Sequence, residues 1–286
     1  MPPGLPKRVA VVGAGTMGHG IAQVAAVAGF ETRLTDVNTD ALASAWQHIQ
    51  SNLAGAVGRG KLTQAQADAA IANVTPVAEL EIATRDVDLA IEAVVEDLAV
   101  KQALFQRLDA LVADTAILAT NTSSLSVTAI SAATKRPSRV IGMHFFNPVH
   151  IMKLVEIVTH HASDDAVVAS ARAAAGQMGK TTIVVRDTPG FASSRLGVIL
   201  GLEAMRMLEA GVASAADIDT AMELGYGHPM GPLRLTDLVG LDVRLKIAEY
   251  LHRELGDTKF APPRILREKV ERGELGKKTG RGFYEW

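Results

Sequence analysis

Two titratable side chains of the sequence stand in apolar surroundings that do not account for them. Glu156 lies inside the run LVEIV, and His144 follows an apolar run and precedes a proline-containing turn. A carboxylate inside a strand needs a partner that compensates its burial, and an imidazole is a suitable one. The carboxylate would fix the histidine tautomer and stabilise imidazolium, so that the other ring nitrogen exchanges a proton with a substrate. The two residues therefore indicate acid–base chemistry, although their spacing alone does not show that they meet.

A glycine-rich stretch, RVAVVGAGTMGHGIA at residues 8–22, forms the second candidate site. Gly13 permits a tight turn, Gly15 lets the backbone approach a phosphate, and Gly18 lets a helix pack close to its strand. Such a turn presents backbone N–H groups and a positive helix end to a pyrophosphate. The stretch predicts a dinucleotide site; the alternative is a glycine-rich turn in a βαβ unit that binds no nucleotide.

Asp36 ends the next apolar run, ETRLTD, roughly 20 residues after the glycines. A carboxylate at this place suits the two ribose hydroxyls of NAD and repels the 2′-phosphate of NADP. We therefore expect NAD as the cofactor.

Composition narrows the class of protein. The 286 residues carry a formal net charge of -2, so the chain has no general basic field for nucleic acid or an anionic membrane. The absence of cysteine excludes disulfides, thiolate catalysis and cysteine-ligated metal, and we assign no metal ligands. No apolar run approaches the roughly 20 residues of a membrane span. We expect a soluble cytoplasmic protein.

Strands and helices alternate through the first two thirds of the chain, which predicts a Rossmann-type, doubly wound, mostly parallel sheet. The expected strands span residues 9–12, 32–35, 87–94, 117–120, 139–143, 154–158 and 181–185. The expected helices between them span 16–28, 38–57, 63–71, 97–111 and 164–178. Ligands of such sheets bind beyond the carboxyl ends of the strands, where Asp36, Glu92, Ser123 and His144 fall.

Only helical patterning follows residue 187, over 191–208, 215–222, 233–255 and 264–272. We therefore expect an NAD-binding domain, residues 1–187, in which residues 38–71 form a helical arm. Residues 188–286 are expected to form a helical C-terminal domain for substrate binding and dimerisation, which makes a homodimer the expected assembly.

Seven motifs occur in an order that resembles the L-3-hydroxyacyl-CoA dehydrogenase family, including the bacterial 3-hydroxybutyryl-CoA and 3-hydroxyadipyl-CoA enzymes. They are GAGTMGHGIA, EAVVEDLAVK, NTSSL, HFFNPV, LVEIV, DTPGF and KKTGRGFY, and they extend from about Arg8 to Tyr284. The resemblance implies a reversible, NAD-dependent oxidation of the 3-hydroxyl of a (3S)-3-hydroxyacyl-CoA. An acyl-CoA thioester is then the substrate.

The resemblance also implies roles for individual residues. His144 is similar to the catalytic base of the family, Glu156 to the acid that pairs with it, and Ser123 to the serine that holds the substrate's 3-oxygen. The implied NAD contacts are Gly13, Gly15, Thr16, Met17, Gly18, Asp36, Glu96, Lys101, Ser123, Asn147 and Lys278. The implied coenzyme A contacts are Ser123 and, on the helical arm, Asn52 and Arg59, with Lys61 close by. Glu96 and Lys101 are also compatible with a solvated helix face, and Arg59 and Lys61 with a solvated turn.

One position departs from the family pattern. Where the family carries Val-Asn-Arg after DTPGF, this chain has Ser193-Ser194-Arg195, so Ser194 replaces the asparagine that helps to hold the substrate oxygen. A serine is shorter and has no amide fork, which leaves the placement of the substrate open. Two alternatives therefore stay beside the main hypothesis: a dehydrogenase of a free 3-hydroxy acid or sugar acid, and a non-catalytic NAD-binding protein.

Overall fold

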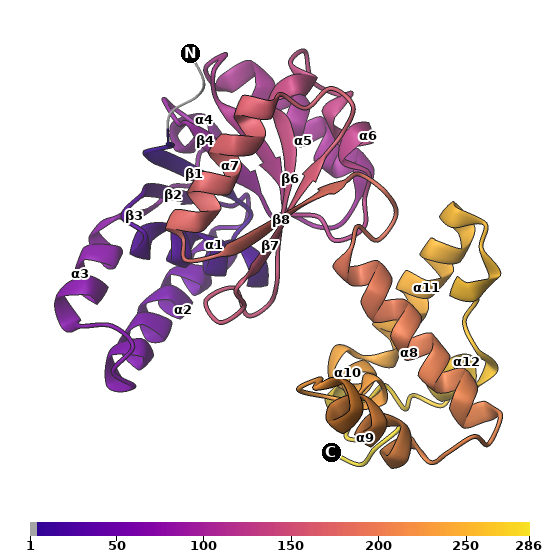
Figure 1. Ribbon diagram of the computed structural model, residues 1–286. Helices are drawn as coiled ribbons and strands as arrows, with labels where there is room; N and C mark the ends of the chain where they lie inside the picture. Colours follow the sequence, from indigo (N-terminus) through magenta and orange to yellow (C-terminus); the bar gives the residue numbers. More distant parts are fainter. Residues whose placement is uncertain (1–4) are drawn as a thin grey trace. The chain divides into compact units, whose positions relative to one another are not determined.

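The computed structural model describes residues 5–286 (Figure 1). The chain divides into two compact units with the boundary between Asp187 and Thr188. The first unit is built on a sheet, and the second unit is helical. Among residues 5–286 no helix has the length and apolar character needed to cross a membrane.

Within the described part of the chain, eight strands form one sheet in the order β3-β2-β1-β4-β5-β6-β7-β8. Their bounds are β1 Arg8–Val12, β2 Glu31–Thr35, β3 Val74–Pro76, β4 Leu89–Glu92, β5 Ile117–Thr120, β6 Val140–Phe145, β7 Leu154–Thr159 and β8 Thr181–Arg186. Neighbouring strands pair in parallel except β6 and β7, which are antiparallel. The predicted doubly wound, mostly parallel sheet is confirmed. The strand order reverses between β1 and β4, and ligands of such sheets bind at that point.

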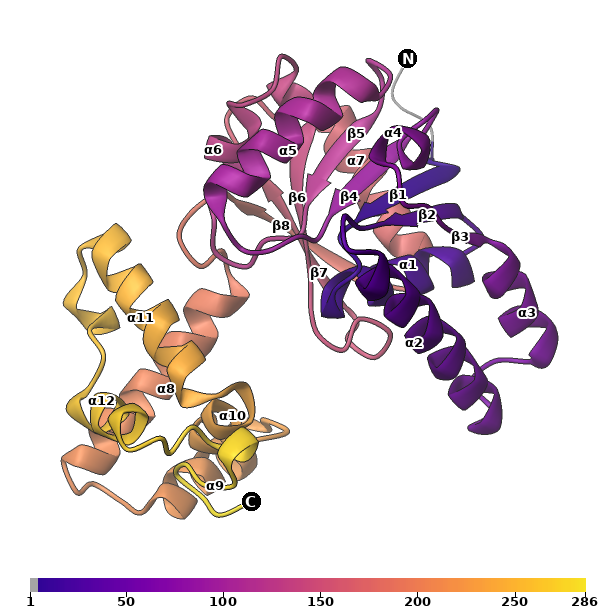
Figure 2. The same ribbon diagram turned by 180° about the vertical axis from the view of Figure 1, so that it is seen from behind.

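Helices cover both faces of the sheet, which explains why its central strands are almost wholly apolar. Helix α1, Thr16–Val27, and helix α7, Asp165–Gln177, lie on one face, and α5, Leu98–Leu111, and α6, Val127–Ser131, lie on the other (Figures 1 and 2). The core between α1, α7 and the sheet is built from side chains such as Ile21, Val9, Ile157 and Ala171.

The predicted helical arm consists of α2, Thr39–Gly58, and α3, Gln64–Ala72. Asn38 caps α2 by accepting from the amides of Asp40 and Ala41. Thr63 and Gln66 form a capping box at the start of α3. Both helices pack against α1, so the arm is tied to the helix that follows the glycine-rich turn.

The second unit packs its helices around an apolar core. The helices are α8 Ser193–Glu209, α9 Ala215–Tyr226, α10 Pro232–Val239, α11 Leu241–Leu255 and α12 Arg264–Glu271. The core contains Val198, Leu202, Met205, Ile218, Leu233, Leu241, Ala248, Leu251, Phe260 and Leu266.

The C-terminal tail is held by Asp237, which is fully buried. Its carboxylate accepts hydrogen bonds from the amides of Phe283 and Tyr284 and from the indole N–H of Trp286. A Cβ atom on Gly282 would lie 2.3 Å from Oδ1 of Asp237. Gly282 of the KKTGRGFY motif therefore permits close packing of the tail.

The single helix expected over residues 233–255 is wrong, because the chain breaks at Gly240 into α10 and α11. Gly240 has φ of 104° and ψ of 129°, a conformation that L side chains rarely adopt. The apolar pattern continues through the break, so periodicity did not reveal it. Several short elements were also absent from the prediction, among them β3, α4 Leu80–Ala83, and α6. The strand expected over 87–94 is shorter, Leu89–Glu92.

The break at Gly240 gives a testable consequence. Gly240→Ala should destabilise the second unit by about 1–3 kcal/mol, because the alanine is forced into a sparsely populated backbone region. Its Cβ would also lie 3.0 Å from Oδ1 of Asp242. Urea unfolding followed by circular dichroism measures the change.

The matched control is Gly225→Ala in α9, where an added Cβ meets nothing within 4 Å. This variant should be neutral or more stable by up to about 1 kcal/mol. Equal effects of the two substitutions would contradict the assignment of the break to backbone conformation.

Candidate active site

The antiparallel pairing of β6 and β7 places His144 directly opposite Glu156. Cross-strand partners lie on the same face of a sheet, so their side chains meet there. The distance between His144 Nδ1 and Glu156 Oε2 is 2.8 Å. The Glu156 side chain is fully buried, and that of His144 is 9% exposed. The structure thus brings together the pair whose meeting the sequence left open.

The chemistry of the couple follows from this contact. An ionised carboxylate only accepts hydrogen bonds, so Nδ1 donates to Glu156, and the tautomer of His144 is set. The ring of Phe146 lies 4.4 Å from the imidazole ring and limits its movement. A histidine held in this way can take up a proton at Nε2 while the buried carboxylate stabilises the resulting charge.

The glycine-rich turn lies at the carboxyl end of β1 and leads into α1. Gly13 has φ of +107°, and a Cβ on Gly18 would lie 1.7 Å from the carbonyl oxygen of Gly13. A Cβ on Gly15 would meet nothing within 4 Å, so the outer surface of the turn is open. The first turn of α1, Thr16 to Gly18, is uncharged and Gly15 supplies no side-chain cap, which leaves its amides available to an anion.

Asp36 follows β2 and is oriented by the backbone. One carboxylate oxygen accepts from the amide of Ala14 at 2.7 Å, and the other accepts from the amide of Asn38 at 2.8 Å. Each oxygen retains a lone pair for a further donor. The carboxylate is therefore prepared for donors such as ribose hydroxyls.

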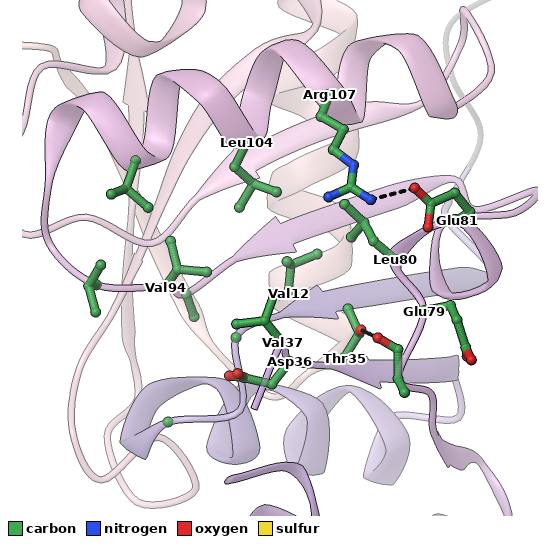
Figure 3. A pocket seen from close by; sticks show the side chains of 16 residues that line it. Val12, Thr35, Asp36, Val37, Glu79, Leu80, Glu81, Val94, Leu104 and Arg107 are labelled. Carbon is green, nitrogen blue, oxygen red and sulfur yellow. Dashed lines mark hydrogen bonds and ion pairs between the residues drawn. The ribbon is translucent and has the colours of Figure 1, made fainter. Parts of the chain in front are cut away.

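Two cavities meet at the glycine-rich turn. The first, of about 520 Å³, is lined by Asp36 together with apolar side chains such as Val37, Leu80, Val94 and Leu104 (Figure 3). The second, of about 510 Å³, contains seven predicted site residues, which are Gly15, Thr16, Met17, Glu96, Ser123, His144 and Asn147. Both cavities are lined by Gly15 and by residues 93–95. They therefore fit the two halves of a dinucleotide whose pyrophosphate lies at the turn.

An ion pair stands at the edge of the first cavity, where Arg107 of α5 donates to Glu81 of α4 at 2.5 Å (Figure 3). The hydrogen bond from Arg107 lowers the pKa of the Glu81 carboxyl. Both side chains are about half exposed, so the pair contributes little to stability.

Ser123 lies in the turn after β5, and Glu96 holds this turn. Oε1 of Glu96 accepts from the Thr122 hydroxyl at 2.5 Å and from the Ser123 amide at 3.0 Å. Lys101 is fully buried, and its ammonium lies 2.5 Å from Glu92 and 3.4 Å from Glu96. Because Lys101 is fully buried, the solvated-face alternative is wrong for this residue. Lys101 also lines neither cavity, and its contacts are to two carboxylates.

The implied coenzyme A residues of the arm lie outside both cavities. Asn52 donates to Gln23 of α1 at 3.1 Å. The guanidinium of Arg59 lies over Gly55, where an added Cβ would be 3.1 Å from Nη1. Partial burial lowers the pKa of His150, and the charges of Arg59 and Lys180 lower it further. Positive charge is thus concentrated between the arm and the segment after Asn147.

Two implied residues belong to the second unit. Ser194 lies in the first turn of α8. Lys278 forms an ion pair with Asp242 at the start of α11, with 2.5 Å between Nζ and Oδ1. Burial raises the pKa of Asp242, but the hydrogen bond and charge of Lys278 outweigh burial and lower it. Lys278 is therefore anchored within its own unit.

One buried residue close to the site had no assigned role, although the sequence carried a signal for it. Glu92 lies in the apolar run VDLAIEAV, as Glu156 does in LVEIV, and its side chain is also fully buried. The carboxylate accepts from Lys101, from the amide of Val94 at 2.7 Å and from the Thr120 hydroxyl at 2.7 Å.

Comparison with known proteins gives matches along the whole described fold. Residues 8–188 match the model of the 3-hydroxyacyl-CoA dehydrogenase NAD binding domain, and residues 190–286 match that of the C-terminal domain. A probable 3-hydroxybutyryl-CoA dehydrogenase of Bacillus subtilis is 45% identical over 280 residues, which cover 98% of this chain and 97% of the relative. The 3-hydroxyadipyl-CoA dehydrogenase of Escherichia coli is 42% identical, over 98% of this chain and 59% of the relative.

A solved structure gives the same result in three dimensions. The (S)-3-hydroxybutyryl-CoA dehydrogenase of Ralstonia eutropha has a TM-score of 0.94 and 39% identity, and the alignment covers 98% of this chain and 99% of that one. With its NAD-binding and C-terminal regions both matched, the chain belongs to the 3-hydroxyacyl-CoA dehydrogenase family.

Proposed function

We propose that this protein is an NAD-dependent dehydrogenase that interconverts (3S)-3-hydroxyacyl-CoA and 3-ketoacyl-CoA thioesters. The observation that carries the proposal is that the second cavity contains His144 and Ser123 and adjoins the cavity of Asp36 along Gly15 and residues 93–95. A dinucleotide bound across the glycine-rich turn with its ribose at Asp36 would direct its other end toward the His144–Glu156 couple.

His144 is the general base of the proposed oxidation. Its Nε2 takes the proton from the 3-hydroxyl of the substrate, and its Nδ1–H stays on the Glu156 carboxylate 2.8 Å away. Bound NAD would supply the hydride acceptor for C3. In the reductive direction, the imidazolium of His144 returns the proton to the 3-oxygen.

Ser123 holds the substrate oxygen while it changes between hydroxyl and carbonyl, and Ser194 of the second unit assists. Asn52 and Arg59 of the arm contact coenzyme A, with Lys61 close by, and the positive charge near His150 is suitable for this ligand. Lys278 and Asn147 contact the cofactor. The proposal further includes a homodimer assembled through the second unit and a cytoplasmic location.

The activity is tested with acetoacetyl-CoA and NADH, and with acetoacetate as the free-acid counterpart. Oxidation of NADH with the thioester alone is expected. Equal or faster turnover of the free acid would transfer the assignment to a free 3-hydroxy acid, and no turnover of either compound would favour a non-catalytic NAD-binding protein.

His144→Ala should lower kcat by about 10²–10⁴-fold, because it removes the proton acceptor but leaves the glycine-rich turn intact. Steady-state kinetics give kcat, and fluorescence titration gives the Kd for NADH, which should change little. His161→Ala removes an exposed histidine and is the control. Full turnover in His144→Ala would contradict the mechanism.

Asp36→Ala should weaken NAD binding and abolish its advantage over NADP, because the carboxylate that repels a 2′-phosphate is gone. The ratio of kcat/KM for the two cofactors measures this change. Asp40→Ala, on the next helix, removes the same negative charge as Asp36→Ala and should leave the ratio as in the wild type. An unchanged ratio in Asp36→Ala would place the ribose contact elsewhere.

Ser194→Asn should raise kcat by about 2–10-fold, since an amide reaches farther than a hydroxyl and adds a hydrogen bond of ordinary strength to the substrate oxygen. Ser193→Asn alters the neighbouring position and serves as the control. A lower kcat for acetoacetyl-CoA in Ser194→Asn would indicate that the pocket is built around the serine.

A further inference from the structure

The buried ion pair of Glu92 and Lys101 is linked through Glu96 to the turn that carries Ser123. Both side chains have no exposed surface, and their charged atoms are 2.5 Å apart. Leaving one such charge without a partner is strongly unfavourable in the interior. The position of Lys101 therefore depends on where negative charge is available.

Two carboxylates compete for this one ammonium. The distance from Nζ of Lys101 is 2.5 Å to Glu92 and 3.4 Å to Glu96, so the ammonium belongs mainly to Glu92. Glu92 is fixed by its own donors, which are the Val94 amide and the hydroxyl of Thr120, its partner across the β4–β5 pairing. Glu92 thus determines how closely the Lys101 ammonium approaches the Glu96 carboxylate.

Glu96 divides its two oxygens between the ammonium and the turn. Oε2 faces Lys101, and Oε1 accepts from the Thr122 hydroxyl and the Ser123 amide. A stronger pull on Oε2 would move the whole carboxylate and loosen its hold on the turn. Such a shift changes where the Ser123 hydroxyl stands in the second cavity.

We propose that Glu92 is a positioning residue for the reaction: by holding Lys101 back from Glu96, it leaves Glu96 able to fix the Thr122–Ser123 turn. The role assigned to Ser123 rests on the proposed function. The placement of the turn does not, so the two parts are tested separately.

The first test concerns the turn in the protein without substrate. In Glu92→Gln the ammonium loses its charged partner and moves to Glu96, so amide hydrogen exchange of residues 121–125, measured by mass spectrometry, should become at least about fivefold faster. Adding Lys101→Met removes the pull on Glu96 and should return exchange toward the wild-type rate. A double variant that exchanges as fast as Glu92→Gln would overturn the proposal.

The second test is a double-mutant cycle with Ser123→Ala, evaluated by kcat for acetoacetyl-CoA reduction. Glu92→Gln should lower kcat by about tenfold, since a small misplacement of a catalytic group is costly. In the Ser123→Ala background its further effect should be less than about twofold, because Glu92 acts through Ser123. Equal effects in both backgrounds would refute a role through Ser123.

Asp109→Asn is the matched control. Like Glu92, Asp109 carries a buried carboxylate, but it lies on α5. Its carboxylate accepts hydrogen bonds from Arg136 and from the amide of Lys135. Its effects should combine multiplicatively with Ser123→Ala, and exchange of residues 121–125 should not change. Coupling of the same size in this control would show a general loss of stability and defeat the proposal.

Thr120→Val keeps the proposal testable if Glu92→Gln does not fold. This variant removes one donor from the Glu92 carboxylate without changing charge. It should accelerate exchange of residues 121–125 and lower kcat, each by less than Glu92→Gln does. Absence of coupling to Ser123→Ala would overturn the inference. If the wild type does not reduce acetoacetyl-CoA, the proposed function fails, whereas the exchange measurements still decide whether Glu92 controls the turn.

Discussion

A carboxylate without exposed surface must be matched by donors, and this requirement governs the centre of the sheet. Glu92 and Glu156 are fully buried, and the residues next to them in their strands are apolar. In each case the compensating donor is a side chain that takes part in the proposed reaction or that contacts a residue of the site. Glu156 holds His144, and Glu92 holds Lys101. The cost of burying these charges is therefore linked to the arrangement of the site.

The two carboxylates differ in how many residues separate them from the proposed substrate. Glu156 touches the histidine that exchanges the proton, and the antiparallel register fixes this contact. Glu92 lines neither cavity, and Lys101 links it to Glu96, while its other donors are the Val94 amide and the Thr120 hydroxyl. This explains how Lys101 can stand at a motif position associated with NAD and yet line neither cavity. A motif match gives the location of a residue in the fold, whereas the contacts of that residue show its role.

Much of the fold follows from the sequence because buried strands and amphipathic helices have distinct periodicities. The pattern of residues 8–36 predicted the first strand and the first helix to within one residue at each end, with the turn between them. Gly240 was missed because an apolar pattern continues on both sides of the break. β3 was missed because a three-residue edge strand that contains Pro76 carries almost no pattern.

For the site, the sequence could identify His144 and Glu156 but not their contact, because pairing depends on register between strands and not on spacing along the chain. Glu92 shows the other limit. The argument that singled out Glu156, a carboxylate in an apolar run, applies equally to Glu92, yet no motif role drew attention to it. An unexplained charge in a buried strand is therefore informative by itself, because the group that neutralises the charge must lie close to it. Where the strand ends at a ligand cavity, that group is a candidate for a role in the site.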